Sequence, residues 1–393
     1  MSYIEDFIAY SKSVCEAPES FHRWCGLWTL AAACGRRISL PFHGRLLYPN
    51  QYLILVGPSA IQKSTIGEIA VRCLQAAGAT NLYEDRVTRA FLAKELAVLT
   101  KEKGRGDMCL FLPELRTALS ELALREGVME MLTRMWDCPD DLGNFLKTEN
   151  EELRKGKHVC CNMLGCSTRQ WLVTGLSKDE IGGGFSARTM LVYGDTLHVI
   201  MDYSPQATDG SLDSRQKAVT KLKSLLAMDG EMELAPDAAK YWSGIRRELA
   251  SRNNLDERLV DLVRRRHIHG LKLAMLLSLS ESDNGLITQQ HIDQSMKLLE
   301  SNESSTLQAL QGVAPSKLTV ITDEIKGIIA ENGGRMTRTQ LTKALNNKRK
   351  GIPPDTLTKV MFSLEEAGDI DIQEEQTVKG KRKTIIYILK EDS

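Results

Sequence analysis

The chain has 393 residues, and its 51 lysines and arginines equal its 51 aspartates and glutamates in number. At about 150 residues per domain, this length predicts two or three domains, each able to bury a core. Zero net charge excludes a general attraction to polyanions, so any nucleic-acid surface must be a local basic patch. Hydrophobic residues at 42% and charged residues at 26% exclude extensive disorder.

The N-terminus and the cysteines indicate where the protein resides. The start MSYIEDFIAYSK lacks the basic and long apolar parts of a signal peptide, and no stretch approaches ~18 uncharged apolar residues. We therefore expect a cytoplasmic protein that does not contact a membrane. All nine cysteines lie between Cys15 and Cys166 and form no C-x-x-C pair, which predicts reduced, mostly buried thiols and neither a zinc site nor a disulfide framework.

Residues 1–45 have apolar side chains near helical spacing, which predicts a mainly helical N-terminal segment. The run YLILVG, from Tyr52, then predicts a buried parallel strand that enters a tight turn. A helix is expected next, over Ser64–Ala77. Further apolar runs predict buried strands at Met108–Leu112, Val159–Leu164 and Thr189–Tyr193. Strands that alternate with helices indicate an α/β core over 46–205, with a parallel sheet flanked by helices.

A loop rich in Ser, Pro, Gly and Asp, Tyr203–Ser214, leads from the core into a predicted helical lid over 206–312. Beyond the loop the pattern is helical throughout, from Arg215 to about Leu310. The last segment, 313–393, is predicted to form three helices and two strands with a basic turn, the layout of a winged helix. Its helices are expected at Thr319–Glu331, Thr337–Leu345 and from Pro353 to near Gly368, and its strands at Ile370–Thr377 and Thr384–Leu389.

The segment after the first strand has the spacing of a phosphate-binding loop, G-x-x-x-x-G-K-[ST], with one departure. Its residues are Gly57, Pro58, Ser59, Ala60, Ile61, Gln62, Lys63, Ser64 and Thr65. Backbone amides at a strand-to-helix turn can hold the phosphates of ATP, with Lys63 on the β- and γ-phosphates and the Ser64 hydroxyl on Mg²⁺. Gln62 replaces the second glycine, where unusual backbone angles are often needed, and is expected to weaken nucleotide binding. An ordinary strand-to-helix turn is the alternative.

Two later strand ends offer polar groups to the same site. The run CLFLPE ends in Glu114, the carboxylate expected to hold Mg²⁺ or to polarise the attacking water. Pro113 stands where an aspartate usually precedes this glutamate, so Glu114 has to act alone. The third strand ends in Ser167 and Thr168, whose hydroxyls are expected to sense the γ-phosphate or orient water. The alternatives are a solvated glutamate and ordinary polar residues at strand ends.

Gly182, Gly183 and Gly184 precede Arg188, which stands just before the fourth strand. A flexible glycine hinge followed by an arginine suits an arginine finger that reaches the ATP of a neighbouring subunit and stabilises charge on the transferred phosphoryl group. Taken alone, an exposed surface arginine is the alternative. The upstream phosphate loop favours the finger.

Taken in order, the runs NQYLILVGPSAIQKST, CLFLPE, NMLGCST and GGGFSARTMLVYGD resemble the helicase-type ATPases of phages and mobile elements, relatives of the AAA+ and MCM-like replicative helicases. The resemblance covers about residues 20–205, with a looser match for the lid and the winged helix. It implies Walker A at Lys63 and Ser64, Walker B at Glu114, sensor 1 at Ser167 or Thr168, and the arginine finger at Arg188. It also implies a ring, expected to be a hexamer, with ATP between neighbouring subunits, in a bacterial or phage-infected cell.

An arginine in the lid falls near the sensor-2 position of these families. The resemblance does not decide among Arg264, Arg265 and Arg266. We take Arg265, the central one, as the expected nucleotide contact. The departures from the family pattern at Gln62 and Pro113 concern the rate of hydrolysis more than the fold.

Two basic regions are candidates for nucleic-acid contact. The segment Asn144–Lys157 is predicted to form a strand, a charged turn and a return strand, and in the resembling families such a hairpin points into the channel of the ring. Its Arg154, Lys155 and Lys157 are expected to touch phosphates without reading sequence, and a solvated surface turn is the alternative. The winged-helix segment carries two basic clusters: Lys348, Arg349 and Lys350, and Lys381, Arg382 and Lys383. These are expected to contact DNA, although many winged helices contact proteins instead.

The expected function is that of a DNA-dependent ATPase, a ring-forming replicative helicase that uses ATP and Mg²⁺ to move along a DNA single strand or fork. A primase or an initiator protein is a candidate partner. One alternative is an AAA+ loader or remodeller that acts on DNA without unwinding it. The other is a DNA-binding regulatory protein whose phosphate loop does not hydrolyse ATP.

Overall fold

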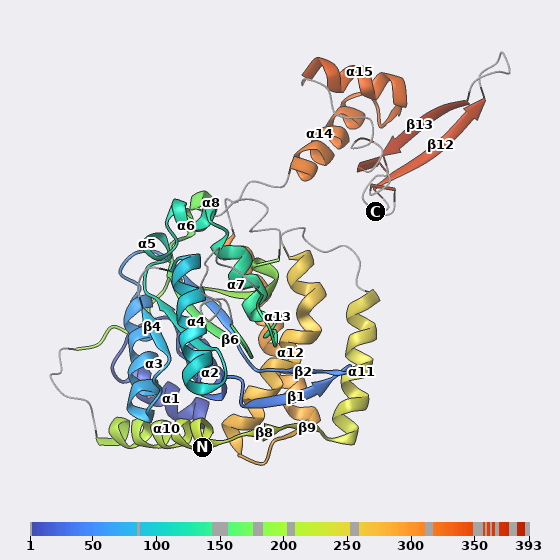
Figure 1. Ribbon diagram of the computed structural model, residues 1–393. Coiled ribbons are helices and arrows are strands. Elements are labelled where there is room, and N and C mark those ends of the chain that lie inside the picture. Colours follow the sequence, from blue (N-terminus) through green and yellow to red (C-terminus); the bar gives the residue numbers. More distant parts are fainter. Residues whose placement is uncertain are drawn as a thin grey trace. The chain divides into compact units, whose positions relative to one another are not determined.

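The computed structural model of the protein (Figure 1) describes residues 2–84, 87–143, 156–175, 184–202, 209–251, 259–310, 317–348 and parts of 357–389. The chain divides into two structural units, of which the first consists of Met1–Arg252 and Asp256–Val313 and the second chiefly of Ala314–Ser393. The first unit thus holds the N-terminal segment, the predicted α/β core and the predicted lid together. The second unit holds the predicted winged-helix segment.

A parallel five-stranded sheet forms the core of the first unit. Its strands are β3 (Tyr52–Val56), β4 (Leu82–Glu84), β5 (Asp107–Leu112), β6 (Cys160–Ser167) and β7 (Thr189–Tyr193), in the order β4-β5-β6-β3-β7. Val56, the last residue of β3, is paired with Ser167 of β6 and Tyr193 of β7, so the three strands end at one edge. The predicted α/β class with a parallel sheet flanked by helices is confirmed. The short edge strand β4 was not predicted.

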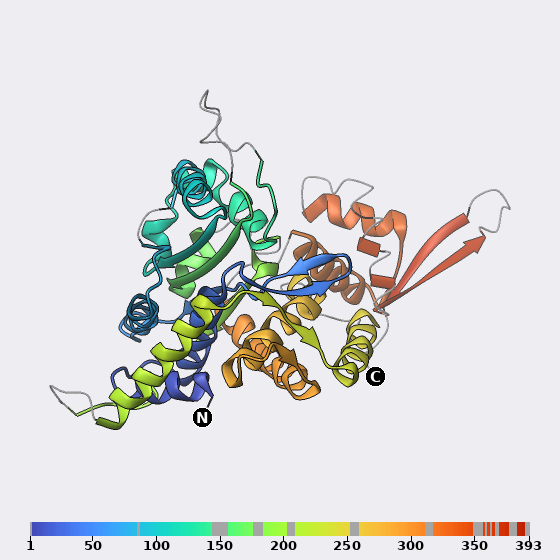
Figure 2. The ribbon, with the colours of Figure 1, turned by 60° about the horizontal axis from the view of Figure 1, so that its bottom comes forward.

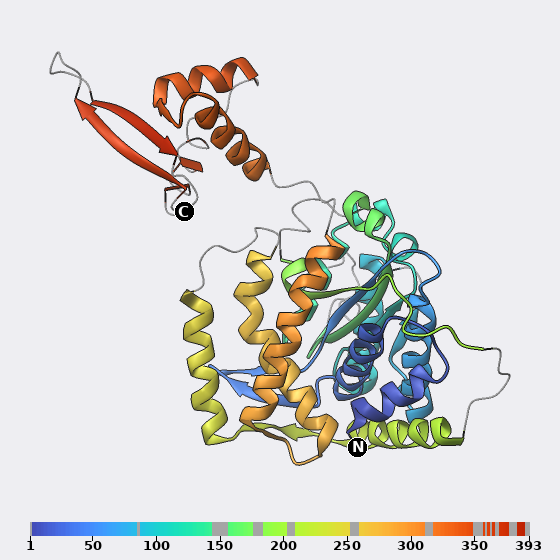
Figure 3. The same ribbon diagram turned by 180° about the vertical axis from the view of Figure 1, so that it is seen from behind.

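Burial on both faces explains why these strands are largely apolar. All residues of β3, β5 and β6 are buried, as is typical of strands covered by helices on each side (Figures 1 and 3). Asn162 donates to a carbonyl of α2 (Glu19–Cys34), and the Tyr52 hydroxyl donates to a carbonyl of α7 (Val128–Trp136). Tyr52 is paired with Met163, the neighbour of Asn162. Because successive side chains of a strand alternate in direction, these two helices cover opposite faces.

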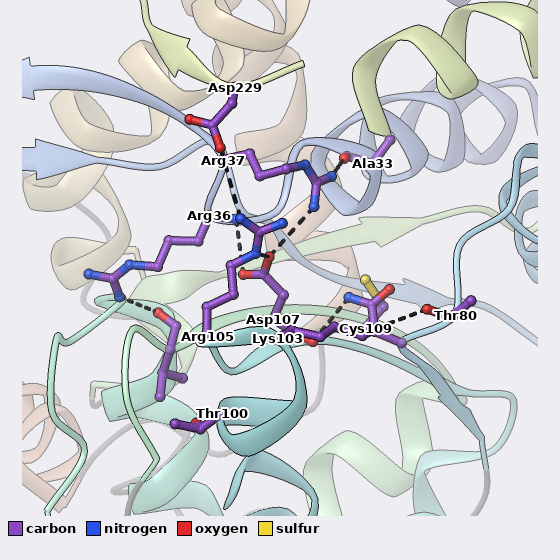
Figure 4. A network of polar contacts seen from close by, with 12 residues as sticks. Ala33, Arg36, Arg37, Thr80, Thr100, Lys103, Arg105, Asp107, Cys109 and Asp229 are labelled. Carbon is purple, nitrogen blue, oxygen red and sulfur yellow. Dashed lines mark hydrogen bonds and ion pairs between the residues drawn. The ribbon is translucent and has the colours of Figure 1, made fainter. Parts of the chain in front are cut away.

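At the amino end of β5, Asp107 is buried among arginines (Figure 4). Its carboxylate accepts from the Arg36 backbone N–H (3.0 Å) and lies 2.9 Å from Arg105 Nε and 3.7 Å from Arg37 Nη1. Burial raises the pKa of this carboxyl above its ordinary value, although the arginines oppose that shift. The network ties the chain just after α2 to the edge of the sheet opposite the phosphate loop.

The N-terminal segment is helical only as far as Cys34, through α1 (Tyr3–Lys12) and α2. The prediction of a mainly helical segment to residue 45 was wrong at its end, where β1 (Ile38–Phe42) and β2 (Arg45–Leu47) form an antiparallel hairpin. Alternate residues of β1 are apolar, and Gly44 stands in the turn with φ of 75°. Both are strand and turn signals that the helical spacing of the preceding residues obscured.

The helices of the predicted lid are α10 (Asp209–Ala227), α11 (Pro236–Ser251), α12 (Val260–Glu281) and α13 (Gln289–Ala309). The expectation of helix throughout is corrected by the short strands β8 (Gly230–Glu231), β9 (Glu233–Leu234) and β10 (Leu286–Ile287). β8 pairs with β1, and β9 pairs with β10. Gly230 and Gly285 break the helical pattern with φ of 152° and 68°. Figure 2 shows α10 alongside α1, so the chain returns to the N-terminal helices after the predicted linker.

The second unit has a core of its own. Its elements are α14 (Lys317–Glu331), β11 (Arg335–Thr337), α15 (Arg338–Lys348), β12 (Ile370–Gln376) and β13 (Lys383–Leu389). The strands form an antiparallel sheet in the order β11-β13-β12, in which β11 was not predicted. Leu341 and Tyr387 are buried together there. The helix expected over Pro353–Gly368 lies largely outside the described residues, and its described helical residues Leu357 and Leu364 are buried in the same core.

All nine cysteines are buried and free, as predicted from the sequence. Among the described residues, no cluster of three or more His, Cys, Asp and Glu side chains could hold a metal ion. No helix in the described ranges has both the length and the apolar character needed to cross a membrane.

We predict that the protein loses stability in acid because of two buried histidines, His22 and His269. Burial lowers the pKa of His22 to about 4 and that of His269 to about 3. The unfolded chain therefore takes up protons below pH 6.5 that the folded chain refuses, so stability is complete above that pH and falls as the pH decreases. Between pH 7 and pH 5 each histidine should lower the free energy of unfolding by about 2 kcal/mol, which urea unfolding at the two pH values measures.

A matched pair of variants isolates this effect. His22→Asn should remove about half of the difference between the two pH values, because it removes one of the two imidazoles whose pKa burial lowers strongly. His43→Asn serves as the control, because His43 is exposed and asparagine accepts its positive φ of 48°. Equal stability of the unmodified protein at both pH values would contradict the prediction.

Candidate nucleotide-binding site

The predicted phosphate loop connects the carboxyl end of β3 to the N-terminus of α3 (Lys63–Ala77). Ala60 and Gln62 take the left-handed backbone conformation, with φ of 66° and 55°. Gly57 is required by a close approach, because a Cβ there would lie 2.2 Å from the Gly194 carbonyl oxygen just after β7. The unpaired amides of the first turn of α3 and the dipole of this helix favour an anion at the loop.

The Gln62 side chain is bound to the stretch between α1 and α2. Its amide nitrogen donates to the Glu16 carboxylate (2.7 Å), and its amide oxygen accepts from the Glu16 backbone N–H (3.1 Å) and the Cys15 thiol (3.2 Å). These bonds offset the cost, about 1–3 kcal/mol, of holding a non-glycine residue at positive φ. The side chain is thus held by the N-terminal stretch and does not line the pocket described below.

Lys63 is the first residue of α3, and its ammonium group folds back over the loop. Nζ donates to the carbonyl of Gly57 (2.9 Å) and to that of Pro58. Burial lowers the pKa of Lys63 below its ordinary value. Because a phosphate is a stronger acceptor for an ammonium group than a neutral carbonyl, an incoming polyphosphate can take over these bonds.

A pocket of about 970 Å³ opens at the carboxyl edge of the sheet. It brings together predicted residues from separate parts of the sequence: Ser59, Ala60, Lys63, Glu114, Ser167 and Thr168. Parallel strands end at the same edge, which is why β3, β5 and β6 deliver these residues to one place. Arg116, Glu121 and Trp171 also line the pocket and were not singled out from the sequence. Ser64 and Thr65 follow Lys63 on α3 and are not part of the lining.

Glu114 stands two residues after the end of β5, with an exposed side chain in the pocket. It is the N-cap residue of the short helix α5 (Leu115–Ala118) and makes no capping bond with its side chain. Mg²⁺ is commonly held by one or two carboxylates together with the phosphates of its substrate. The Glu114 carboxylate is an oxygen donor of this kind within the pocket, whereas Ser64, the other predicted magnesium ligand, is not part of the lining.

Ser167 and Thr168 lie where β6 ends, between the strands that carry Glu114 and Lys63. The Ser167 carbonyl accepts from the Gly57 backbone N–H (3.2 Å), which joins the phosphate loop to β6. The Thr168 hydroxyl accepts from the Trp171 N–H (3.3 Å) at the start of α8 (Arg169–Gly175), and the Ser167 hydroxyl donates to the Thr168 carbonyl (3.1 Å). Both hydroxyls are thus anchored by the local backbone.

Arg188 lies at the other edge of the sheet, directly before β7, whose first residue is paired with the first residue of β3. Its side chain is buried, with Nη2 2.6 Å and Nε 3.4 Å from the Asp137 carboxylate and Nη1 2.8 Å from the Gly184 carbonyl. The alternative of an exposed surface arginine is therefore not observed. A finger role requires that Asp137 release the guanidinium, and it remains a prediction.

The three lid arginines, all on α12, are separated by the structure. Arg265 Nη1 lies 3.9 Å from Asp137, so it shares this carboxylate with Arg188 and is not part of the pocket lining. Arg266 is buried and forms ion pairs with Glu300 and Glu303 of α13. Arg264 is exposed. Asp137 carries no sequence signal, because it comes close to Arg188 only in the folded chain.

The predicted nucleic-acid contacts are described only in part. Lys157 forms an antiparallel bridge with Asp141, and its Nζ lies 3.4 Å from that carboxylate. A backbone hydrogen bond from the Leu142 N–H to the Gly156 carbonyl (3.0 Å) extends this pairing. Lys348 ends α15 and Lys383 begins β13. The other predicted contacts lie outside the described residues: Arg154, Lys155, Arg349, Lys350, Lys381 and Arg382.

The buried lysine Lys272, which lies near Arg188, should contribute strongly to the stability of the fold. Lys272 Nζ donates to Asn50 Oδ1 (2.5 Å) and lies 3.7 Å from the ring centroid of Trp136. Burial lowers the pKa of Lys272 to about 8, so the group is largely charged at neutral pH. Asn50→Ala removes the acceptor and should lower the free energy of unfolding by about 3 kcal/mol, measured by urea unfolding.

A substitution of Lys272, the partner of Asn50, separates the effect of the lost hydrogen bond from that of lost side-chain packing. Lys272→Met removes the buried charge, so it should cost less than Asn50→Ala, and the double variant should be more stable than Asn50→Ala alone. An Asn50→Ala protein with an unchanged urea midpoint, or a double variant less stable than both single ones, would contradict this account.

The fold and the pocket together define an α/β protein with a five-stranded parallel sheet, flanked by helices, and a polar pocket at the carboxyl edge of that sheet. The sequence matches no protein-family model and no curated protein.

Proposed function

We propose that the protein is a DNA-dependent ATPase, a ring-forming replicative helicase of the phage or mobile-element type that acts in the cytoplasm of a bacterial or phage-infected cell. The observation that carries this proposal is the convergence of Lys63, Glu114 and Ser167 in one pocket beside the N-terminus of α3. A cation for phosphate, a carboxylate for water and a strand-end hydroxyl are the groups that phosphoryl transfer to water needs.

In the proposed site, the loop amides and Lys63 bind the β- and γ-phosphates of ATP. The Ser64 hydroxyl and the Glu114 carboxylate would hold Mg²⁺, which would neutralise phosphate charge. Glu114 orients a water molecule and accepts one of its protons while the oxygen attacks the γ-phosphorus. The bond from this phosphorus to the bridging oxygen breaks, and ADP leaves with its electron pair.

In this proposal, the edge of the sheet opposite the phosphate loop supports a subunit interface. Arg188 and Arg265 lie at the amino ends of the strands, whereas the phosphate loop follows a carboxyl end. The two arginines are thus remote from the nucleotide of their own chain and suited only to that of a neighbour. Head-to-tail contacts of this kind form a ring when the rotation between successive subunits closes.

DNA is the proposed partner, through Lys157 and the basic clusters of the second unit, and a primase or an initiator protein is a candidate additional partner. The AAA+ loader and the regulatory protein without hydrolysis are alternatives that the same assays separate. Unwinding of a forked duplex supports the helicase. Turnover stimulated by DNA without unwinding favours the loader, and ATP binding without turnover favours the regulatory protein.

The decisive experiment measures phosphate release from Mg·ATP by the full chain, with and without single-stranded DNA. We expect turnover that rises with DNA, and loss of both ATP binding and turnover in Lys63→Ala. Electron microscopy with ATP and DNA should display rings. A well-folded protein that takes up no nucleotide at millimolar magnesium would refute the proposal.

A further inference from the structure

We infer that Arg116 is a further catalytic residue of the pocket, whose guanidinium contacts the terminal phosphate of ATP bound to the same chain. This inference deepens the proposed function and rests on it. The inference concerns which residue supplies the positive charge that stabilises the transferred phosphoryl group. The sequence motifs assign this role to Arg188 of a neighbouring subunit.

The position of Arg116 supports the inference. Arg116 lines the same pocket as Lys63 and Glu114, and it follows Glu114 by two residues on α5. Leu115, between them, is buried and lies against Gly165 of β6, where a Cβ would approach its Cδ2 to 2.9 Å. The missing side chain at Gly165 thus lets Leu115 anchor α5 on the sheet. This anchor holds the carboxylate and the guanidinium at the rim of one cavity.

The guanidinium of Arg116 is also available. Its side chain is exposed, and among the residues that the structure describes it has no hydrogen bond or ion pair. The neighbouring Arg125 differs, because it forms an ion pair with Glu121 (3.6 Å). The pocket therefore contains two cations, Lys63 and Arg116, and two carboxylates, Glu114 and Glu121. Of the two cations, Arg116 has no partner among the described residues.

Arg188 cannot supply this charge in the arrangement described. Its guanidinium is buried, lies 2.6 Å from Asp137 and is close to the Trp136 ring. Releasing it would leave the partly exposed Asp137 without its closest cation, whereas Arg116 needs no bond to be broken. The structure thus offers a guanidinium within the same chain at lower cost than one from a neighbour.

The chemistry of a guanidinium fits this position. Its planar, fixed donors can bind two phosphate oxygens at once, and it keeps its proton at any pH the protein tolerates. Charge accumulates on the γ-phosphoryl oxygens and the bridging oxygen as the bond to ADP breaks, and an arginine there stabilises that charge. Lys63, a point charge, serves the bound phosphates in both states. Arg116 should therefore matter more for turnover and for recognition of ATP over ADP than for nucleotide binding as such.

The test compares Arg116→Ala and Arg116→Lys with Arg125→Ala, a matched exposed arginine on the next helix, α6 (Glu121–Arg125). Arg116→Ala should lower kcat about 1000-fold, the effect of removing an arginine from a phosphoryl-transfer site. It should also weaken ATP binding about tenfold while leaving ADP binding unchanged, as one lost charge-assisted contact would. Added guanidinium ion should restore part of the turnover in Arg116→Ala and none in Lys63→Ala. Arg125→Ala should retain kcat and both affinities.

The outcomes distinguish this inference from the proposed function. Arg116→Ala with unchanged kcat and an unchanged ratio of ATP to ADP affinity would overturn the inference while the unmodified protein still hydrolyses ATP. An unmodified protein that binds ATP without turnover would refute the ATPase, and the affinity ratio would still decide the contact of Arg116. Turnover restored by mixing Arg116→Ala with Lys63→Ala would overturn the assignment to the same chain, because a neighbour would then be supplying the arginine.

Discussion

Glu114→Gln should bind Mg·ATP with nearly unchanged affinity and hydrolyse it about 100- to 10,000-fold more slowly, the range that general-base catalysis contributes. Glutamine keeps the size and an oxygen donor of the side chain but cannot accept a proton from water. Pro113 precedes Glu114 where a second carboxylate could have stood, and no other residue from the end of β5 can take over this role. Equilibrium binding and phosphate release measured on one preparation test both parts of the prediction.

Glu121→Gln is the matched control, since Glu121 lines the same pocket but lies on α6, beyond the strand end. It should keep most of the turnover. If Glu114→Gln turned over ATP at the normal rate, water would be activated elsewhere and the role assigned to Glu114 would be lost. If both variants were equally impaired, the effect would reflect the charge of the pocket and not a general base.

Gly57→Ala should weaken ATP binding about 100-fold, the size of effect expected when binding groups are displaced by about 1 Å. The added Cβ would lie 2.2 Å from the Gly194 carbonyl oxygen and 3.1 Å from Ile61, so the loop or the end of β7 must move. The Gly57 carbonyl also holds the Lys63 ammonium group, which would move with it. Titration calorimetry with ATP measures the loss.

Gly244→Ala provides the control for this substitution. Gly244 lies within α11, and a Cβ there meets nothing within 4 Å. Alanine should stabilise the helix by up to about 1 kcal/mol and leave ATP binding unchanged. Thermal unfolding of both variants tests whether Gly57→Ala remains folded. A folded Gly57→Ala protein with normal affinity would mean that the loop relaxes without consequence for the phosphates.

The parallel sheet could be predicted because buried strands are apolar on both faces. The runs that form β3, β5 and β7 stand out against helical neighbours, and the predicted bounds of β7, Thr189–Tyr193, are those observed. β4 is three residues long and only partly buried, so it carries too little pattern to be recognised. The β1 hairpin was missed because the helical spacing of the preceding residues was extended past Gly35, Arg36 and Arg37, the polar break that separates α2 from β1.

The pocket could be predicted in part for a topological reason. Once the strands are known to be parallel, Lys63, Glu114 and Ser167 must lie at the same edge of the sheet. The strand order, with β6 between β5 and β3, then brings them into one pocket. Contacts between side chains have no such rule. The Asp137–Arg188 pair spans 51 residues and the Gln62–Glu16 pair spans 46, and neither follows a periodic pattern. Arg116 was missed because a position four residues after a strand end, on a short helix, is an ordinary place for a surface arginine.

The bonds of Gln62 have a consequence for the residues that precede the α/β core. Glu16 also accepts from the Met201 backbone N–H (2.5 Å) through its carboxylate and from the His198 N–H (3.1 Å) through its carbonyl. Hydrogen bonds thereby join the phosphate loop to two chain segments that no nucleotide motif includes. Ligand that rigidifies the loop should slow hydrogen exchange at those amides, and a fragment that started at β3 would lose this linkage along with the N-terminal helices.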